Sequence, residues 1–411
     1  MFSYMRREPG FYRQVVALAA PIVLQNLITS TLSMADTFMV GMLGEAPMAA
    51  VTLANIPLFV VQLFIFGVQS GASVLISQYW GKQDMEAINR VIGVALWVVL
   101  LVSSAFAAVL LICPREFLSL FGNQPDVVAM AAEYGSIAGI SYVCNAFTMI
   151  YVAAYRSMEH PALGMYILAA SMTVNTCLNW VFIFGNLGAP ALGVQGAALA
   201  TLIARCLEVV IVVTHMVKTR FFRVRAGLLV RPGGSMVRRF LRYGGLVVLN
   251  ETMWGLGTSV MPTIMGHMEG STEILAAYTV AGNVEKMCTV FSFGLAATAA
   301  VIIGREIGAG RTKNLKNVGL TMDTLAVMCA ILCGLLLCFV RFVAPQWVFP
   351  LFKLSAGASS VATMMITVMA CVMPLRNFNT VNIVGVLRGG GDVRAATLID
   401  VGNLWLVAIP Y

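Results

Sequence analysis

Three carboxylic acids lie inside long apolar stretches of the sequence, where their presence most needs an explanation. They are Asp36, Glu251 and Asp400. An ionisable group at the centre of a membrane-spanning helix costs about 2.5–3.5 kcal/mol on insertion scales, so each such group needs a partner or a function. Glu251 and Asp400 are predicted to face a cavity, with a purely structural hydrogen-bonding role as the alternative for both.

Asp36 is the strongest candidate for chemistry, because nothing in its own segment neutralises it. Asn175 and Asn179 are four residues apart, so they share one face of a helix, and Thr201 offers a hydroxyl from the next segment. One carboxylate with neutral amide and hydroxyl oxygens can hold a proton or a hard cation. We expect these four residues to bind H⁺ or Na⁺; an aspartate hydrogen-bonded only for packing is the alternative.

The segments that carry these residues are those of a membrane protein. The chain has 411 residues, of which 59% are hydrophobic and only 11% charged, whereas about a quarter of a soluble domain is charged. Each complete apolar span has the roughly 20 residues needed to cross a bilayer. The predicted spans are 13–41, 48–80, 88–112, 127–155, 162–184, 192–217, 240–266, 274–304, 315–340, 358–387 and 395–411.

The chain contains an internal duplication, because the stretch 48–91 returns without gaps at 275–318. The identities include Phe64 with Phe291, Gly67 with Gly294 and Gly81 with Gly308. A second echo aligns Asn145 and Arg156 with Asn377 and Arg388. Duplicated helix bundles are typical of transporters, in which two halves alternate about a central site.

We therefore predict an all-α polytopic fold of two pseudo-symmetric six-helix lobes. The N-terminal lobe covers 1–217, a basic cytoplasmic linker covers 218–239, and the C-terminal lobe covers 240–411. The chain ends within the eleventh span, so we expect the second lobe to be incomplete, with the eleventh helix partial and the twelfth absent.

The net charge of +8 indicates membrane topology rather than nucleic-acid binding. Lys and Arg fill every second connection, whereas the other connections hold only Arg115, Arg341 and Lys353. The positive-inside bias then predicts a cytoplasmic N-terminus. Arg205 and Glu208, three residues apart, are expected to pair locally on one helix.

Enzyme motifs give no competing prediction. The sequence holds no His-Glu-x-x-His, no Gly-x-Ser-x-Gly and no phosphate loop, and the segment Gly389-Gly390-Gly391-Asp392 is expected to be a cytoplasmic turn after Arg388 rather than a protease motif. We expect no enzymatic activity and no cofactor beyond the coupling ion.

Several motifs together resemble the multidrug and toxic compound extrusion (MATE) efflux transporters. They are MADTFMVGMLGEAPMAAVTLAN, VLISQYWGKQD, VNTCLNWVFIFG, GAALATLIARCLE and VLRGGGDVRAATLID, and the resemblance covers essentially the whole chain. It implies twelve helices in two lobes and the exchange of Na⁺ or H⁺ for organic cations. By resemblance Asp36 matches the family's coupling aspartate, with Asn175, Asn179 and Thr201 as its partners, and Glu251 matches an acid that many members use.

The sequence departs from the family at two positions. Some members carry a second acid where this chain has Asn179, and some carry an aspartate where it has Asn377. Asn377 joins Glu251 and Asp400 as a candidate for lining a substrate cavity, but a cation site at Asn377 is not expected.

The sequence thus predicts a monomeric antiporter in the cytoplasmic membrane that exchanges amphipathic organic cations for H⁺ or Na⁺. Its partners would be small organic cations and the lipid bilayer, with no nucleic acid. The alternative is a flippase of lipid-linked cell-envelope precursors from the same superfamily, which would want a basic cavity for phosphates.

Overall fold

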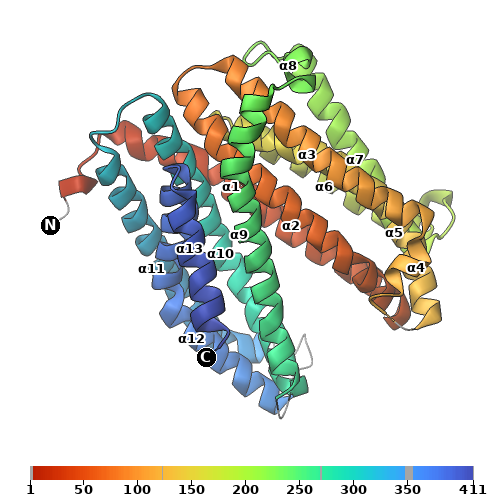
Figure 1. The fold of residues 1–411 in the computed structure, drawn as a ribbon. Coiled ribbons are helices and arrows are strands. Elements are labelled where there is room, and N and C mark those ends of the chain that lie inside the picture. Colours follow the sequence, from red (N-terminus) through yellow and green to blue (C-terminus); the bar gives the residue numbers. More distant parts are fainter. Residues whose placement is uncertain (1–2, 123, 269–270, 348–354, 411) are drawn as a thin grey trace. The chain divides into compact units, whose positions relative to one another are not determined.

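A computed structural model describes residues 3–122, 124–268, 271–347 and 355–410, which are helical nearly throughout (Figure 1). The long helices are α1 (Pro9–Gly41), α2 (Glu45–Gly81), α3 (Met85–Ile112), α5 (Pro125–Ser157), α6 (Ala162–Phe184), α7 (Gly193–Lys218), α9 (Gly234–Gly266), α10 (Ser271–Gly308), α11 (Leu315–Trp347) and α12 (Ala356–Thr380). Shorter elements are α4 (Pro114–Leu118), α8 (Ala226–Val230), α13 (Val393–Asn403), the 3₁₀ turns η1 (Ser3–Met5) and η2 (Asn186–Gly188), and the π-helical turns η4 (Val381–Leu387) and η5 (Leu404–Ala408).

Each predicted span coincides with one helix or one helix and its continuation, so the all-α polytopic prediction is confirmed. Among the described residues, nine helices are long and apolar enough to cross a membrane. The α9 helix is not among these nine. The last predicted span, 395–411, corresponds to α13 and η5.

The chain forms two compact units, Leu24–Thr252 and Met1–Val23 with Met253–Tyr411. The boundaries fall inside α1 and α9, so each of these helices contributes to both units. Each unit is described by itself below, and the lobes 1–217 and 240–411 stay a prediction.

In the unit Leu24–Thr252, α5 is the central helix and contacts α2, α3, α4, α6 and α7. Its buried side chains include Ile150, Tyr151 and Tyr155, which share one apolar cluster with Ile65 and Ile76 of α2. The polar residues of α5 that face inward, among them Asn145, are therefore held by packing on several sides.

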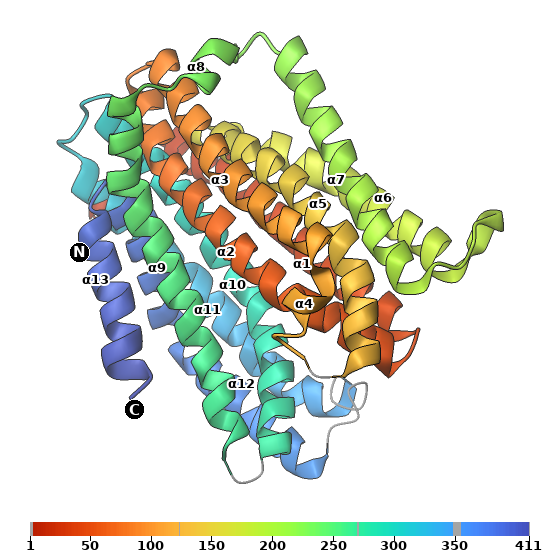
Figure 2. The same ribbon diagram turned by 45° about the vertical axis from the view of Figure 1, so that its right-hand side comes forward.

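Two glycines of α2 allow the first half of α9 to lie directly against it, as both views of the ribbon show (Figures 1 and 2). A Cβ atom on Gly67 would lie 2.8 Å from the Cα of Val248, and one on Gly71 would lie 2.5 Å from the Cα of Gly244. The small-residue spacing of Gly67 and Gly71 thus permits close backbone approach.

The other unit is built around α10 and α12, which contact each other and α11. The π-helical turn η4 continues α12 and also packs on α10, where a Cβ on Gly385 would lie 2.8 Å from the carbonyl oxygen of Ala296. The N-terminal turn η1 lies on α11, because Thr321 Oγ1 donates to the carbonyl of Tyr4 at 3.0 Å.

The duplication predicted from the sequence is visible in the turn after α2 and the turn after α10. In the first, Gln83 has φ 58° and donates its backbone N–H to Trp80, and Asp84 donates to Tyr79. In the second, Gly310 has φ 75° and donates to Ile307, and Arg311 donates to Glu306. These are the positions that the sequence alignment of 48–91 with 275–318 equates.

The second echo is confirmed in the same way at the ends of α5 and η4. Glu159 (φ 67°) donates to Arg156, and Gly391 (φ 89°) donates to Arg388. The expected turn at Gly389–Asp392 is therefore present, and Asp392 accepts from the N–H of Ala395 at 3.1 Å to cap α13.

The predicted linker, residues 218–239, is hydrogen-bonded to α3. Asn89, buried in α3, donates to the carbonyl of Arg223 at 3.3 Å and accepts from the N–H of Arg225 at 2.9 Å. An exposed ion pair joins Arg225 to Glu86 at 2.5 Å. One buried amide side chain thus satisfies two backbone groups of this segment.

Asn89→Ala should release the segment around residues 219–233. Loss of the amide leaves the N–H of Arg225 without its buried partner, which costs about 1–3 kcal/mol. Limited trypsin digestion, which cleaves at the many Arg residues here, should become several-fold faster. Glu86→Gln is the control: it removes only an exposed ion pair worth roughly 0–1 kcal/mol and should leave the rate nearly unchanged. Equal rates in wild type and Asn89→Ala would contradict the fastening role.

Candidate functional site

The structure brings Asp36 of α1 together with both amides of α6. Asn179 Nδ2 donates to Asp36 Oδ1 at 2.6 Å and also lies 3.4 Å from Asn175 Oδ1. Asn175 Nδ2 donates to Thr201 Oγ1 of α7 at 3.3 Å. The four residues predicted from the sequence therefore form one connected polar group inside the unit Leu24–Thr252.

The hairpin of α6 and α7 positions three of these residues. The N–H of Leu192 donates to the carbonyl of Phe182 at 2.8 Å, and a Cβ on Gly196 would lie 2.5 Å from that same carbonyl oxygen. The start of α7 therefore packs tightly on the end of α6. A turn and a half further along α7, Thr201 meets Asn175.

The Asn175 amide has a second orientation that suits the site. When the amide is turned by 180°, its nitrogen lies 3.0 and 3.3 Å from the two Asp36 carboxylate oxygens, and its oxygen lies 3.2 Å from the Thr201 backbone nitrogen. In that orientation both α6 amides donate to Asp36, because amide nitrogens are donors and carboxylate oxygens are acceptors.

The possible cation ligands in the group of Asp36, Asn175, Asn179 and Thr201 are carboxylate, amide and hydroxyl oxygens. Asn175 and Asn179 are 5% and 2% exposed, and Asn179 Oδ1 finds no hydrogen-bond partner among the described residues. A buried acceptor without a donor is the arrangement that a hard cation, which prefers oxygen ligands, would satisfy. No cluster of three or more His, Cys, Asp or Glu side chains with metal-site geometry occurs among the described residues.

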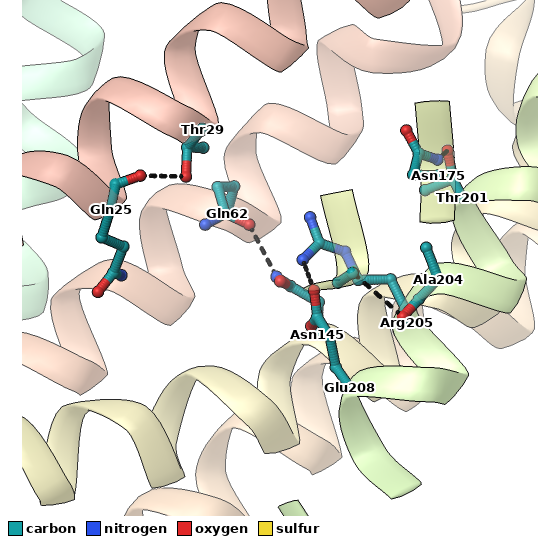
Figure 3. A network of polar contacts seen from close by, with 10 residues as sticks. Gln25, Thr29, Gln62, Asn145, Asn175, Thr201, Ala204, Arg205 and Glu208 are labelled. Carbon is teal, nitrogen blue, oxygen red and sulfur yellow. Dashed lines mark hydrogen bonds and ion pairs between the residues drawn. The ribbon is translucent and has the colours of Figure 1, made fainter. Parts of the chain in front are cut away.

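A second polar group lies one turn further along α7 (Figure 3). Arg205 Nη1 pairs with Glu208 Oε1 at 2.7 Å, which confirms the predicted local ion pair. Nearby, Asn145 Nδ2 of α5 donates to Gln62 Oε1 of α2 at 3.0 Å. The sequence analysis missed the Gln62–Asn145 contact, since a lone Gln in an apolar helix gives no spacing signal.

Taken together, Asp36, Glu208 and Arg205 carry one negative charge in excess. Asp36 and Glu208 each contribute one negative charge, and Arg205, which acts electrostatically on Asp36, contributes one positive charge. A group of this composition attracts a monovalent cation and repels an anion.

Of the remaining predicted site residues, Glu251 belongs to the same unit as Asp36, whereas Asn377 and Asp400 belong to the other unit. Glu251 is buried in α9 at 7% exposure. Asp400 of α13 pairs with the buried Arg388 at 3.6 Å, an arrangement that favours its structural alternative. Asn377 of α12 is 1% exposed, and both of its side-chain polar atoms find no hydrogen-bond partner among the described residues.

Solved structures of similar fold cover almost the whole chain. An outward-facing multidrug resistance MATE family transporter of the MOP superfamily superimposes with a TM-score of 0.86 at 19% identity, covering 100% of this chain and 89% of that one. A variant of the Vibrio cholerae MATE transporter VcmN gives a TM-score of 0.87 at 18% identity, covering 97% and 88%. These likenesses show that the chain has the all-helical fold of those two structures.

The family model MatE matches residues 21–181 and 246–411, and the chain belongs to this family of transporters. Similar proteins include the probable multidrug resistance protein NorM of Rhizobium meliloti, 27% identical over 78% of this chain and 68% of that protein. NorM of Thermotoga maritima is 22% identical over 99% and 87%, and the probable multidrug resistance protein YoeA of Bacillus subtilis is 24% identical over 100% and 88%.

Proposed function

We propose that this protein is a secondary active multidrug efflux antiporter that exports amphipathic organic cations in exchange for H⁺ or Na⁺. The observation that carries the proposal is the half-buried Asp36 carboxylate held by Asn179 at 2.6 Å, close along α7 to an Arg205–Glu208 pair that is itself neutral, so that one negative charge is in excess. The names of the NorM and YoeA relatives agree with this activity.

The proposed mechanism is competition for one carboxylate. H⁺ or Na⁺ binds at Asp36 with help from the oxygens of Asn175, Asn179 and Thr201, and this weakens the binding of the organic cation. Antiport needs only that the two ligands compete or prefer different states of the protein, with a coupling free energy of about 1–3 kcal/mol. Glu251, Asn377 and Asp400 remain candidates for lining the path of the organic cation.

The flippase alternative is less well supported, because it requires free positive charge in the interior. Arg205 is paired with Glu208, and Arg376 is paired with Glu285. Each guanidinium group is thus neutralised by a carboxylate, and a lipid phosphate would have to displace that carboxylate in order to bind. We include in the proposal that the protein acts as a monomer in the cytoplasmic membrane, with its N-terminus in the cytoplasm.

Reconstituted vesicles test the proposal directly. A fluorescent cationic dye is followed in one run with an imposed pH gradient at equal Na⁺, and in another with an imposed Na⁺ gradient at equal pH. At least one gradient should drive dye transport, and the run that does so identifies the coupling ion. Dye movement that ignores both gradients, or transport of a fluorescent lipid-linked phosphate instead, would refute the antiport proposal.

A further inference from the structure

The ion pair between Arg205 and Glu208 has no packing role that explains it. Both residues lie on α7, so their contact does not join one helix to another. The Glu208 side chain is fully buried, whereas the Arg205 side chain is 23% exposed. Burying a charge pair is unfavourable enough that apolar residues often replace it without loss of stability. The pair therefore calls for a functional explanation.

Only one of the two carboxylate oxygens of Glu208 accepts a hydrogen bond from the described residues. Its Oε1 accepts from Arg205, but its Oε2 is buried and has no hydrogen-bond partner among the residues that the structure describes. Asn145 Oδ1, in the same polar region of the unit, is likewise a buried acceptor without a donor (Figure 3). A proton on Glu208 Oε2 would remove the buried negative charge and turn this atom from an acceptor without a donor into a donor.

Arg205 lies on the same helix face as a member of the Asp36 group. It follows Thr201 by four residues, so both lie on the same face of α7, and Thr201 belongs to the Asp36 group through its contact with Asn175. The positive charge of Arg205 acts electrostatically on Asp36. The Arg205 side chain is partly exposed and carries five N–H donors on a flexible stem, so it can pair with a second carboxylate that comes within reach.

The other groups around Glu208 do not compete with it for protons. The titratable neighbours are Tyr142 and Cys144 on α5 and Cys206 on α7, with Asp36 on α1 beyond Arg205. Phenols and thiols release their protons at far higher pH than carboxylic acids do. Gln62 of α2 and Asn145 of α5 do not titrate.

We propose that Glu208 is a second proton-binding site, which takes up a proton when a cation leaves Asp36, and that Arg205 moves between the two carboxylates. With a cation at Asp36, Arg205 pairs with an ionised Glu208, and the group is neutral. When the cation departs, Arg205 pairs with Asp36, and a proton from water settles on Glu208. The group is neutral again, so one proton replaces one monovalent cation.

This inference rests on the proposed function, because it assumes that Asp36 binds the organic cation. The test uses tetraphenylphosphonium, which carries a fixed charge, and the purified full chain in a weakly buffered, sodium-free detergent solution containing a pH indicator. Binding affinity and the number of protons released per bound cation are measured between about pH 5 and pH 8. Wild type should release about one proton per cation at the pH of greatest release, since proton and cation binding oppose each other reciprocally.

Two variants separate Glu208 from a general loss of structure. Glu208→Gln leaves Arg205 no charged partner except Asp36, so tetraphenylphosphonium binding should weaken at least about tenfold, and the proton release should disappear. The double variant Arg205→Met/Glu208→Gln removes the competitor as well, and should restore the affinity to the wild-type value or better while still releasing no proton.

The same measurements on Asp36→Asn distinguish a failure of the proposed function from a failure of the role proposed for Glu208. If Asp36→Asn binds the cation as wild type does, the proposed function itself fails. If Asp36→Asn loses binding but Glu208→Gln still releases a proton, or if wild type releases none, the function stands and the role of Glu208 is overturned. An unrestored affinity in the double variant overturns the movement of Arg205.

Discussion

Replacing Asp36 by Asn should reduce gradient-driven efflux of a cationic dye by roughly 5- to 150-fold, the range that a lost coupling free energy of about 1–3 kcal/mol implies. The Asn side chain keeps the shape of the carboxyl group but cannot carry the negative charge for which the ion and the organic cation compete. Asn179, at 2.6 Å, would face an amide in place of a carboxylate. The measurement is dye efflux from proteoliposomes under whichever gradient drives the wild type.

Asp126→Asn is the matched control for this experiment. The same chemical change is made at an exposed residue in the first turn of α5, so efflux should stay near the wild-type rate. Size-exclusion chromatography of both variants checks that each remains folded. Undiminished efflux in Asp36→Asn would remove Asp36 from the mechanism.

Gly71→Ala should cause a large loss of stability in the unit Leu24–Thr252. Its Cβ would lie 2.5 Å from the Cα of Gly244, a backbone atom that no side-chain rotation can move away. The two helices must therefore separate, and overpacking of this kind costs about 1–3 kcal/mol or more. Thermal unfolding in detergent should show a clearly lower midpoint than in the wild type.

Gly245→Ala tests whether the loss comes from the contact rather than from the change of residue type. Gly245 is the neighbour of Gly244 in α9, and a Cβ there would meet nothing within 4 Å. Because Ala favours the helix over Gly by about 0.5–1 kcal/mol, this variant should be as stable as wild type or slightly more stable. A Gly71→Ala protein that matches it would show that α2 and α9 do not pack this closely.

The sequence was sufficient to predict the Asp36 group because each clue was local. Asn175 and Asn179 share a helix face by their spacing, and a lone acid in an apolar span demands partners of their kind. Hydropathy placed the helices to within a few residues for the same reason, since each span is long and continuous. The roles of Glu251, Asn377 and Asp400 stay a prediction.

What the sequence could not show depends on contacts between distant segments. The partner of Asn145 is Gln62, two helices away along the chain, and neither residue lies in a repeating pattern. The fastening of residues 223 and 225 by Asn89 likewise has no local signature, because an amide in a helix usually faces solvent. The Arg205–Glu208 pair was visible, but its full burial on the glutamate side was not.

The paired turns after α2 and α10 differ in one respect that bears on engineering. Both copies require a residue in the left-handed region, yet the later copy uses Gly310 and the earlier one uses Gln83, whose side chain must tolerate that conformation. A β-carbon in this region costs about 1 kcal/mol, a penalty that glycine escapes. Gln83 is exposed, so replacing it by the glycine found at the equivalent position of the second copy should give a more stable protein for crystallisation.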